Sequence, residues 1–123
     1  MKTVVFCFIL FFNNPNSLED LITSLEIRSS EEISNYFDSN SEIIINEKVS
    51  KGNKFQLTKT LDNFFTKNNL REFKIIHKGD SQNNIIYMLA EYSSNDDIYK
   101  VFLTLLKAEK KYIIQKFKID IRE

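Results

Sequence analysis

The second half of the chain, from Arg71 to the C-terminus, is a series of short apolar runs separated by polar turns. The runs are rich in β-branched and aromatic residues, which favour strands, and short connections join neighbouring strands antiparallel. One strongly amphipathic helical segment lies directly before them. This order predicts an α+β fold in which helices pack against a curved antiparallel sheet and leave room for a pocket.

The helical segment before the strand runs has the clearest periodicity in the chain. Its apolar residues recur at helical spacing: Leu57, Leu61, Phe64 and Phe65. The opposite side is predicted to carry Lys59, Asp62, Asn63 and Lys67. Asn53 and Gln56 have the spacing of a capping box, and Asn68 with Asn69 tolerate the left-handed conformation that ends helices. We expect the aromatic stripe to anchor this helix to the sheet.

The chain before that helix predicts shorter elements. Ser17 is placed to cap a first helix, and Ser29 with Ser30 to cap a second one. The pattern fits one kinked helix or two short ones. The β-branched run Glu42–Asn46 predicts a strand, followed by a turn at Gly52 and Asn53.

Alternation along the later runs predicts which side chains share a face. Phe73, Ile75 and His77 lie on one side of the first strand, which ends in a hairpin turn over residues 78–82. The run from Ile85 to Ala90 is apolar on both sides, as in an interior strand. In the strand that begins near Tyr99, one side carries Val101, Leu103 and Leu105, and the other side carries Phe102, Thr104 and Leu106. In the last strand, the apolar side carries Ile113, Phe117, Ile119 and Ile121.

The amino terminus differs from the rest of the chain. Residues 1–17 have a positive start, an apolar run from Val4 to Phe12 and turn formers after it, which predicts a signal peptide followed by a single domain over residues 18–123. The alternatives are a buried first strand or a misassigned start. The run is much shorter than the roughly 20 residues of a membrane-spanning helix, so we expect no permanent span. We expect an exported protein, periplasmic or associated with the cell envelope.

Charge and composition exclude several classes of function. Basic and acidic residues balance at 17 each and are scattered, which argues against a nucleic-acid partner. The single histidine, and a single cysteine inside the predicted leader, provide no set of metal ligands. The two glycines are isolated, so no phosphate-binding loop is present. We expect no metal and no cofactor.

A set of short motifs in a fixed order resembles a known family. They are Tyr36-Phe37, Gln56, Phe64-Phe65, His77 with Gly79, Tyr87, and Ile113-Ile114-Gln115. Their order and spacing resemble DUF4783, a family of uncharacterised secreted proteins from Bacteroidetes. The resemblance implies an NTF2-like, cystatin-related cone in which N-terminal helices pack into the hollow of a bent antiparallel sheet. It implies no particular activity.

Two functions follow as alternatives. The first is a non-catalytic binding or scaffolding domain of the cell envelope, with an unknown small molecule or envelope protein as its partner. The second is a cofactor-free isomerase or dehydratase, which the resemblance to enzymatic cones implies, with His77 as base and Tyr87 as hydrogen-bond donor. The pocket candidates are Tyr36, Gln56, Phe64, His77 and Tyr87. The open sheet face is a candidate surface for a homodimer.

Overall fold

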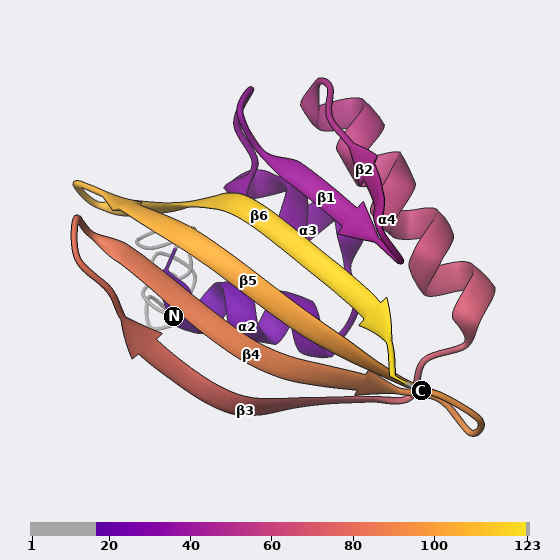
Figure 1. The fold of residues 1–123 in the computed structure, drawn as a ribbon. Helices are drawn as coiled ribbons and strands as arrows, with labels where there is room; N and C mark the ends of the chain where they lie inside the picture. The colour runs from indigo at the N-terminus through magenta and orange to yellow at the C-terminus, as the bar shows by residue number, and fades with distance from the viewer. Residues whose placement is uncertain (1–16, 123) are drawn as a thin grey trace, which may run out of the picture.

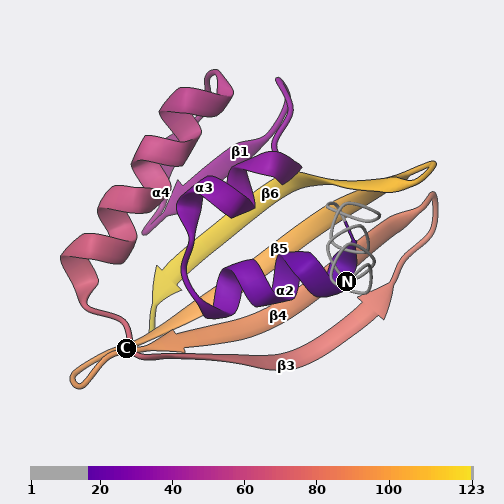
Figure 2. The ribbon, with the colours of Figure 1, turned by 180° about the vertical axis from the view of Figure 1, so that it is seen from behind.

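The structure is a computed structural model that describes residues 17–122. Its helical elements are α2 (Leu18–Glu26), α3 (Ser30–Ile33), the 3-10 turn η1 (Ser34–Tyr36) and α4 (Lys54–Asn68). Its strands are β1 (Glu42–Ile45), β2 (Lys48–Ser50), β3 (Glu72–Asp80), β4 (Ile85–Ser93), β5 (Ile98–Ala108) and β6 (Lys111–Ile121). The strands form one curved sheet, and α2 and α3 lie across its concave face (Figures 1 and 2).

The first two helices are separate because each has its own cap. The Ser17 hydroxyl accepts a hydrogen bond from the Asp20 amide at 3.1 Å, and the Ser29 hydroxyl accepts one from the Glu32 amide at 3.2 Å. Between them Arg28 takes the left-handed conformation, with φ 57°, which ends the first helix. Of the two possibilities open from sequence, two short helices is therefore correct.

The long helix α4 begins and ends where the sequence predicts. The Gln56 amide donates to Asn53 Oδ1 at 2.9 Å, and the Asn53 amide donates to Gln56 Oε1 at 3.3 Å, which completes the capping box. Asn69 ends the helix in the left-handed conformation, with φ 48°. The capping signals alone were enough to place this element.

The sheet is mixed, which corrects the prediction of an antiparallel one. Its strand order is β2-β1-β6-β5-β4-β3. The meander β3 to β6 is antiparallel throughout, and β4 is an interior strand as predicted. However, β1 pairs with β6 in parallel. Parallel pairing needs a long connection, and β2, α4, β3, β4 and β5 lie between these two strands in the chain.

A β-bulge in β3 places His77 on the unexpected face. Ile75 pairs with Ala90, whereas His77 pairs with Leu89, so Ile76 is an extra residue between them. An extra residue reverses the alternation and bends the strand. His77 therefore lies on the outer face of the sheet, and the prediction that it shares a side with Phe73 and Ile75 is wrong.

A second bulge changes the face of β6. Thr104 pairs with Lys116 and Leu105 with Ile114, which leaves Gln115 as the extra residue. Ile114 is consequently fully buried, where alternation from Phe117 predicted Ile113. The buried Ser41 hydroxyl donates to the carbonyl of Ile114 at 2.5 Å, beside this bulge.

The turn between β3 and β4 lies later than predicted. The strand continues to Asp80, and the chain reverses through Asn83 and Asn84, with φ of 62° and 63°. Asparagine tolerates this left-handed region better than most residues. Gly79 is therefore a strand residue, and a Cβ at this position would lie 2.7 Å from the Tyr87 hydroxyl oxygen.

The helices are held to the concave face by aromatic contacts. The ring of Phe64 meets Tyr99 edge-on, with centroids 5.3 Å apart, and Phe65 meets Tyr92 at 5.5 Å. The Tyr92 hydroxyl also donates to the carbonyl of Leu25 at the end of α2, at 2.7 Å. These tyrosines pack as apolar residues while their hydroxyls bind helix ends. The predicted anchoring of α4 by its phenylalanines is confirmed.

Truncating a leucine to alanine is expected to cost more stability on the buried face of the sheet than on its outer face. Leu103 on β5 is fully buried against the helices, whereas Leu89 on β4 faces outward and is 38% exposed. We expect Leu103→Ala to lower the free energy of unfolding by about 2–5 kcal/mol, because it leaves a cavity. We expect Leu89→Ala to lower it by less than about 1 kcal/mol. Urea unfolding in dilute solution measures both, and equal losses would contradict this assignment of the faces.

The buried tyrosines predict a loss of stability in alkali. Burial raises the pKa of Tyr92, and burial together with the charges of Asp20 and Glu32 raises the pKa of Tyr36 to about 12. Tyrosine in the unfolded chain titrates near about 10. Above that pH the unfolded chain loses protons that the folded chain keeps, so the free energy of unfolding falls as the pH rises from about 10 to 12.

Tyr92→Phe separates this effect from the hydrogen bond itself. At pH 7 we expect the variant to be about 0.5–1.5 kcal/mol less stable than the parent, because it loses the hydrogen bond to the Leu25 carbonyl, which keeps the Arg28 amide as its other donor. That difference is expected to shrink above about pH 10, because the raised pKa of Tyr92 lowers the free energy of unfolding of the parent there and the variant lacks this group. Guanidinium unfolding from pH 7 to 12 measures it, and a difference that stays constant with pH would refute the assignment.

Candidate functional site

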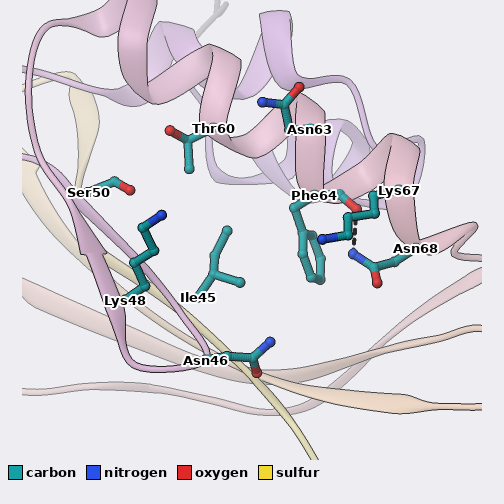
Figure 3. Close-up of a pocket in the computed structure, with 9 residues that line it drawn as sticks. All are labelled: Ile45, Asn46, Lys48, Ser50, Thr60, Asn63, Phe64, Lys67 and Asn68. Atoms are coloured by element: carbon teal, nitrogen blue, oxygen red, sulfur yellow. Dashed lines mark hydrogen bonds between the residues drawn. The ribbon is translucent and has the colours of Figure 1, made fainter.

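An open cleft lies between the β1–β2 hairpin and α4. It has a volume of about 350 Å³, at the low end of the range for small-ligand sites. Its lining comprises Ile45, Asn46, Lys48, Ser50, Thr60, Asn63, Phe64, Lys67 and Asn68. Figure 3 shows the hairpin side chains and the helix side chains facing each other across this space, with Ile45 and Phe64 between them.

The hairpin side of the cleft is fixed by a two-residue turn. Asn46 and Glu47 both have positive φ, 48° and 73°, as a tight turn with the twist of the strands requires. The Asn46 amide donates to the Ile119 carbonyl at 2.8 Å, and Asn46 Oδ1 accepts from the Ile121 amide at 2.9 Å. Its Oδ1 is therefore committed to β6, while its Nδ2 is directed toward the cleft in Figure 3.

The helix side follows from the spacing of residues on α4. Thr60, Asn63 and Lys67 are three and four residues apart, so they lie on one side of the helix. Asn68 follows them but has other partners, since its Nδ2 donates to the Phe64 carbonyl at 2.8 Å and its Oδ1 accepts from the Tyr99 hydroxyl at 3.0 Å. Asn68 thus braces the end of the helix against β5.

The charge in the cleft has one sign. Lys48 and Lys67 are its cationic residues, and no carboxylate belongs to the lining. Within residues 17–122 neither lysine forms an ion pair; the ion pairs there join Lys51 to Glu42, Lys118 to Asp120, and Arg122 to Glu91. The cleft is therefore locally positive in a chain whose formal charge is zero.

His77 and Tyr87 are in contact, but not in this cleft. Their Nε2 and hydroxyl oxygen are 3.2 Å apart on the outer face of the sheet, where His77 is exposed and Tyr87 is half-buried over Gly79. Among the described residues no third side chain bonds to the imidazole. A general base needs such an orienting group and an enclosed substrate position, so this pair has the geometry of a surface contact.

The other predicted site residues lie elsewhere. The buried Tyr36 donates its hydroxyl to the Ser17 carbonyl at 3.0 Å, which ties η1 to the start of α2. Gln56 is exposed in the capping box of α4. Phe64 alone of the five lines the cleft. The structure therefore brings together His77 and Tyr87, and separates this pair from Tyr36, Gln56 and Phe64.

Sequence reasoning missed most of the residues in the cleft. The periodicity of α4 predicts Asn63 and Lys67 on the side away from the core, and both are exposed there. What makes them lining residues is the hairpin that faces them. The signal for that hairpin was two strand-like runs separated by two residues, the first of them an asparagine.

The described part of the chain has further hollows besides this cleft. One of about 250 Å³ lies on the outer face, lined by Leu89, Lys100, Val101, Phe102, Lys118 and Asp120. Another of about 420 Å³ lies at the far end of the sheet from the cleft, and its lining includes Asp80 and Lys107, one charge of each sign. Neither concentrates uncommitted polar groups of one charge as the cleft does.

Residues 17–122 hold no grouping of three or more histidine, cysteine, aspartate or glutamate side chains suited to a metal ion. None of the helices described is both long enough and apolar enough to cross a bilayer.

Similarity to known proteins identifies the family. No curated protein sequence matches the chain. Among solved structures, a DUF4783 family protein from Bacteroides uniformis is 21% identical with a TM-score of 0.78, covering 88% of this chain and 99% of its own. One from Bacteroides ovatus is 23% identical with a TM-score of 0.76, covering 84% and 93%.

The fold extends beyond these relatives. An NTF-2 like protein of unknown function from Silicibacter pomeroyi is 12% identical with a TM-score of 0.63, covering 85% of this chain and 92% of its own. The predicted NTF2-like α+β fold is thus confirmed. The family described as "Domain of unknown function (DUF4783)" matches residues 18–120, and the chain belongs to this family.

Proposed function

We propose that this protein is a non-catalytic binding domain whose ligand site is the cleft between the β1–β2 hairpin and α4. The observation that carries the proposal is the set of polar side chains there without partners in the described part of the chain. Asn63 and Thr60 make no side-chain hydrogen bond, and Lys48 and Lys67 no ion pair. Small-ligand sites combine such polar groups with an apolar floor, here Ile45 and Phe64.

The composition of the core supports binding over catalysis. Buried polar side chains between residues 17 and 122 are four serines, Ser24, Ser30, Ser34 and Ser41, besides the tyrosine hydroxyls. Each serine donates a hydrogen bond to a neighbouring oxygen. An isomerase or dehydratase of the kind considered from sequence needs a titratable base in an apolar pocket. The one histidine is on the outer face instead, so no specific observation favours that alternative.

We place this binding function in the cell envelope. The support comes from residues 1–16, which lie outside the described part of the structure and with Ser17 form the predicted signal peptide. An exported binding domain meets small molecules and envelope proteins rather than cytosolic metabolites.

The ligand site is testable with protein recovered from an envelope fraction. We expect native mass spectrometry to detect a retained small molecule, and Thr60→Trp to abolish its retention, because the indole fills the cleft. Thr66→Trp is the matched control on the same helix outside the cleft, and it is expected to retain the ligand. Equal retention by both variants, with circular dichroism showing both folded, would place the site elsewhere.

We further propose that two copies associate through the outer face of the sheet. Leu89 and Phe102 form an apolar centre there, with Lys100, Lys118 and Asp120 around the same hollow. The two lysines and the aspartate place charges of both signs around this centre. Such self-complementary charge around an apolar centre is what an isologous interface requires.

Sedimentation tests the association. We expect the parent to sediment with the mass of two chains at high concentration, and Leu89→Lys to sediment as one chain, because it buries an unpaired charge at the centre of the interface. Ile27→Lys is the control, since Ile27 is 60% exposed at the end of α2 on the helical side. A parent of single-chain mass at all concentrations would exclude this dimer.

A further inference from the structure

The cleft carries information about the chemistry of its ligand. Resting on the binding function proposed above, we propose that it takes an acidic sugar, a hydroxylated ring that bears a carboxylate or a phosphate. The charged group lies between Lys48 and Lys67, and the hydroxyls meet the neutral polar side chains of the lining. The carboxylate and phosphate forms share this chemistry and are distinguished by the experiment below.

The two lysines supply the preference for an anion. Lys48 comes from β2 and Lys67 from the last turn of α4, so they approach the space from opposite walls (Figure 3). Lys67 also suits the negative end of the helix dipole, but Lys48 on a strand has no such role. Within the described residues neither ammonium group is neutralised by a carboxylate. An anion between them forms charge-assisted hydrogen bonds with both walls.

The neutral side chains supply the preference for hydroxyls. Asn63 and Thr60 each present both donors and acceptors, and neither side chain has another bond in the described part of the chain. Asn46 adds its Nδ2, which is held in place because its Oδ1 is bonded to Ile121. Amides and hydroxyls that both donate and accept match sugar hydroxyls, which do the same. A purely aliphatic anion would leave them unpaired.

The floor and size limit the ligand to a small molecule. Ile45 is half-buried and Phe64 is 5% exposed, so the apolar surface offered is an edge rather than an open aromatic face. The volume of about 350 Å³ is at the low end for ligand sites. A monosaccharide presents one apolar side of its ring to such a floor and directs its hydroxyls at the walls. The openness of the cleft also allows a terminal residue of a longer acidic glycan.

Amide chemical-shift titration of the full chain tests the proposal with four probes. They are glucuronate, glucose 6-phosphate, neutral glucose and cationic glucosamine. We expect one or both anions to shift the amides of Asn46, Thr60 and Asn63 in a saturable manner, with glucose and glucosamine at least about tenfold weaker. The stronger of the two anions identifies the carboxylate or the phosphate as the natural group. Raising the salt concentration is expected to weaken the anions and leave glucose unchanged.

Charge-removing variants locate the contact. Lys48→Gln and Lys67→Gln are each expected to weaken the preferred anion about tenfold, since each removes one charge-assisted contact. Lys110→Gln is the matched control, because Lys110 is an exposed lysine in the turn between β5 and β6, outside the cleft. An unchanged affinity in both cleft variants, with their spectra showing intact folds, overturns the proposal.

The outcomes separate this inference from the binding function beneath it. If glucose or glucosamine shifts the cleft amides as strongly as the anions, the acidic class is wrong while the ligand site stands. If no probe shifts them but native protein retains another molecule that Thr60→Trp loses, the sugar class is wrong and the binding function again stands. If no probe binds and nothing is retained, both fail.

Discussion

The packing of α4 and α2 on the tyrosines of the concave face is the interaction on which the rest of the structure depends. Phe64 and Phe65 meet Tyr99 and Tyr92 edge-on, and the Tyr92 hydroxyl binds the last turn of α2. These contacts bury the aromatic rings, and the hydroxyls of Tyr92 and Tyr99 donate to Leu25 and Asn68 at the ends of the two helices. The cleft lies beside this packing, between α4 and the β1–β2 hairpin.

The two bulges bend the strands β3 and β6, and they also determine which side chains of these strands face the core and which face outward. An extra residue at Ile76 bends β3, and one at Gln115 bends β6. The same extra residues move His77 to the outer face and Ile114 into the core. The prediction of His77 as a base assumed that it shares a side with Phe73 and Ile75. The bulge between Ile75 and His77 reverses that alternation. A strand that bends enough to wrap a helix layer does not keep a period of two along its whole length.

The cleft depends on the parallel pairing of β1 with β6. This pairing places the tight turn at Asn46 beside the end of β6, where Asn46 bonds to Ile119 and Ile121. The hairpin is then held opposite the polar side of α4, whose Thr60, Asn63 and Lys67 would otherwise face only solvent. The cleft thus forms between the hairpin and α4, and neither of them by itself indicates it. Its polar groups stay uncommitted because no described element packs over them.

The sequence by itself determined the elements that local chemistry specifies. The capping box from Asn53 to Gln56, the aromatic stripe of α4 and the interior character of β4 could all be predicted, because caps and periodicity act within a few residues. Only the tertiary structure decided the bulges, the parallel position of β1 and the placement of Lys48 and Lys67 in the lining of one cleft. These features join residues far apart in the chain, and their energies come from how the bent sheet closes around its helices, which no local pattern encodes.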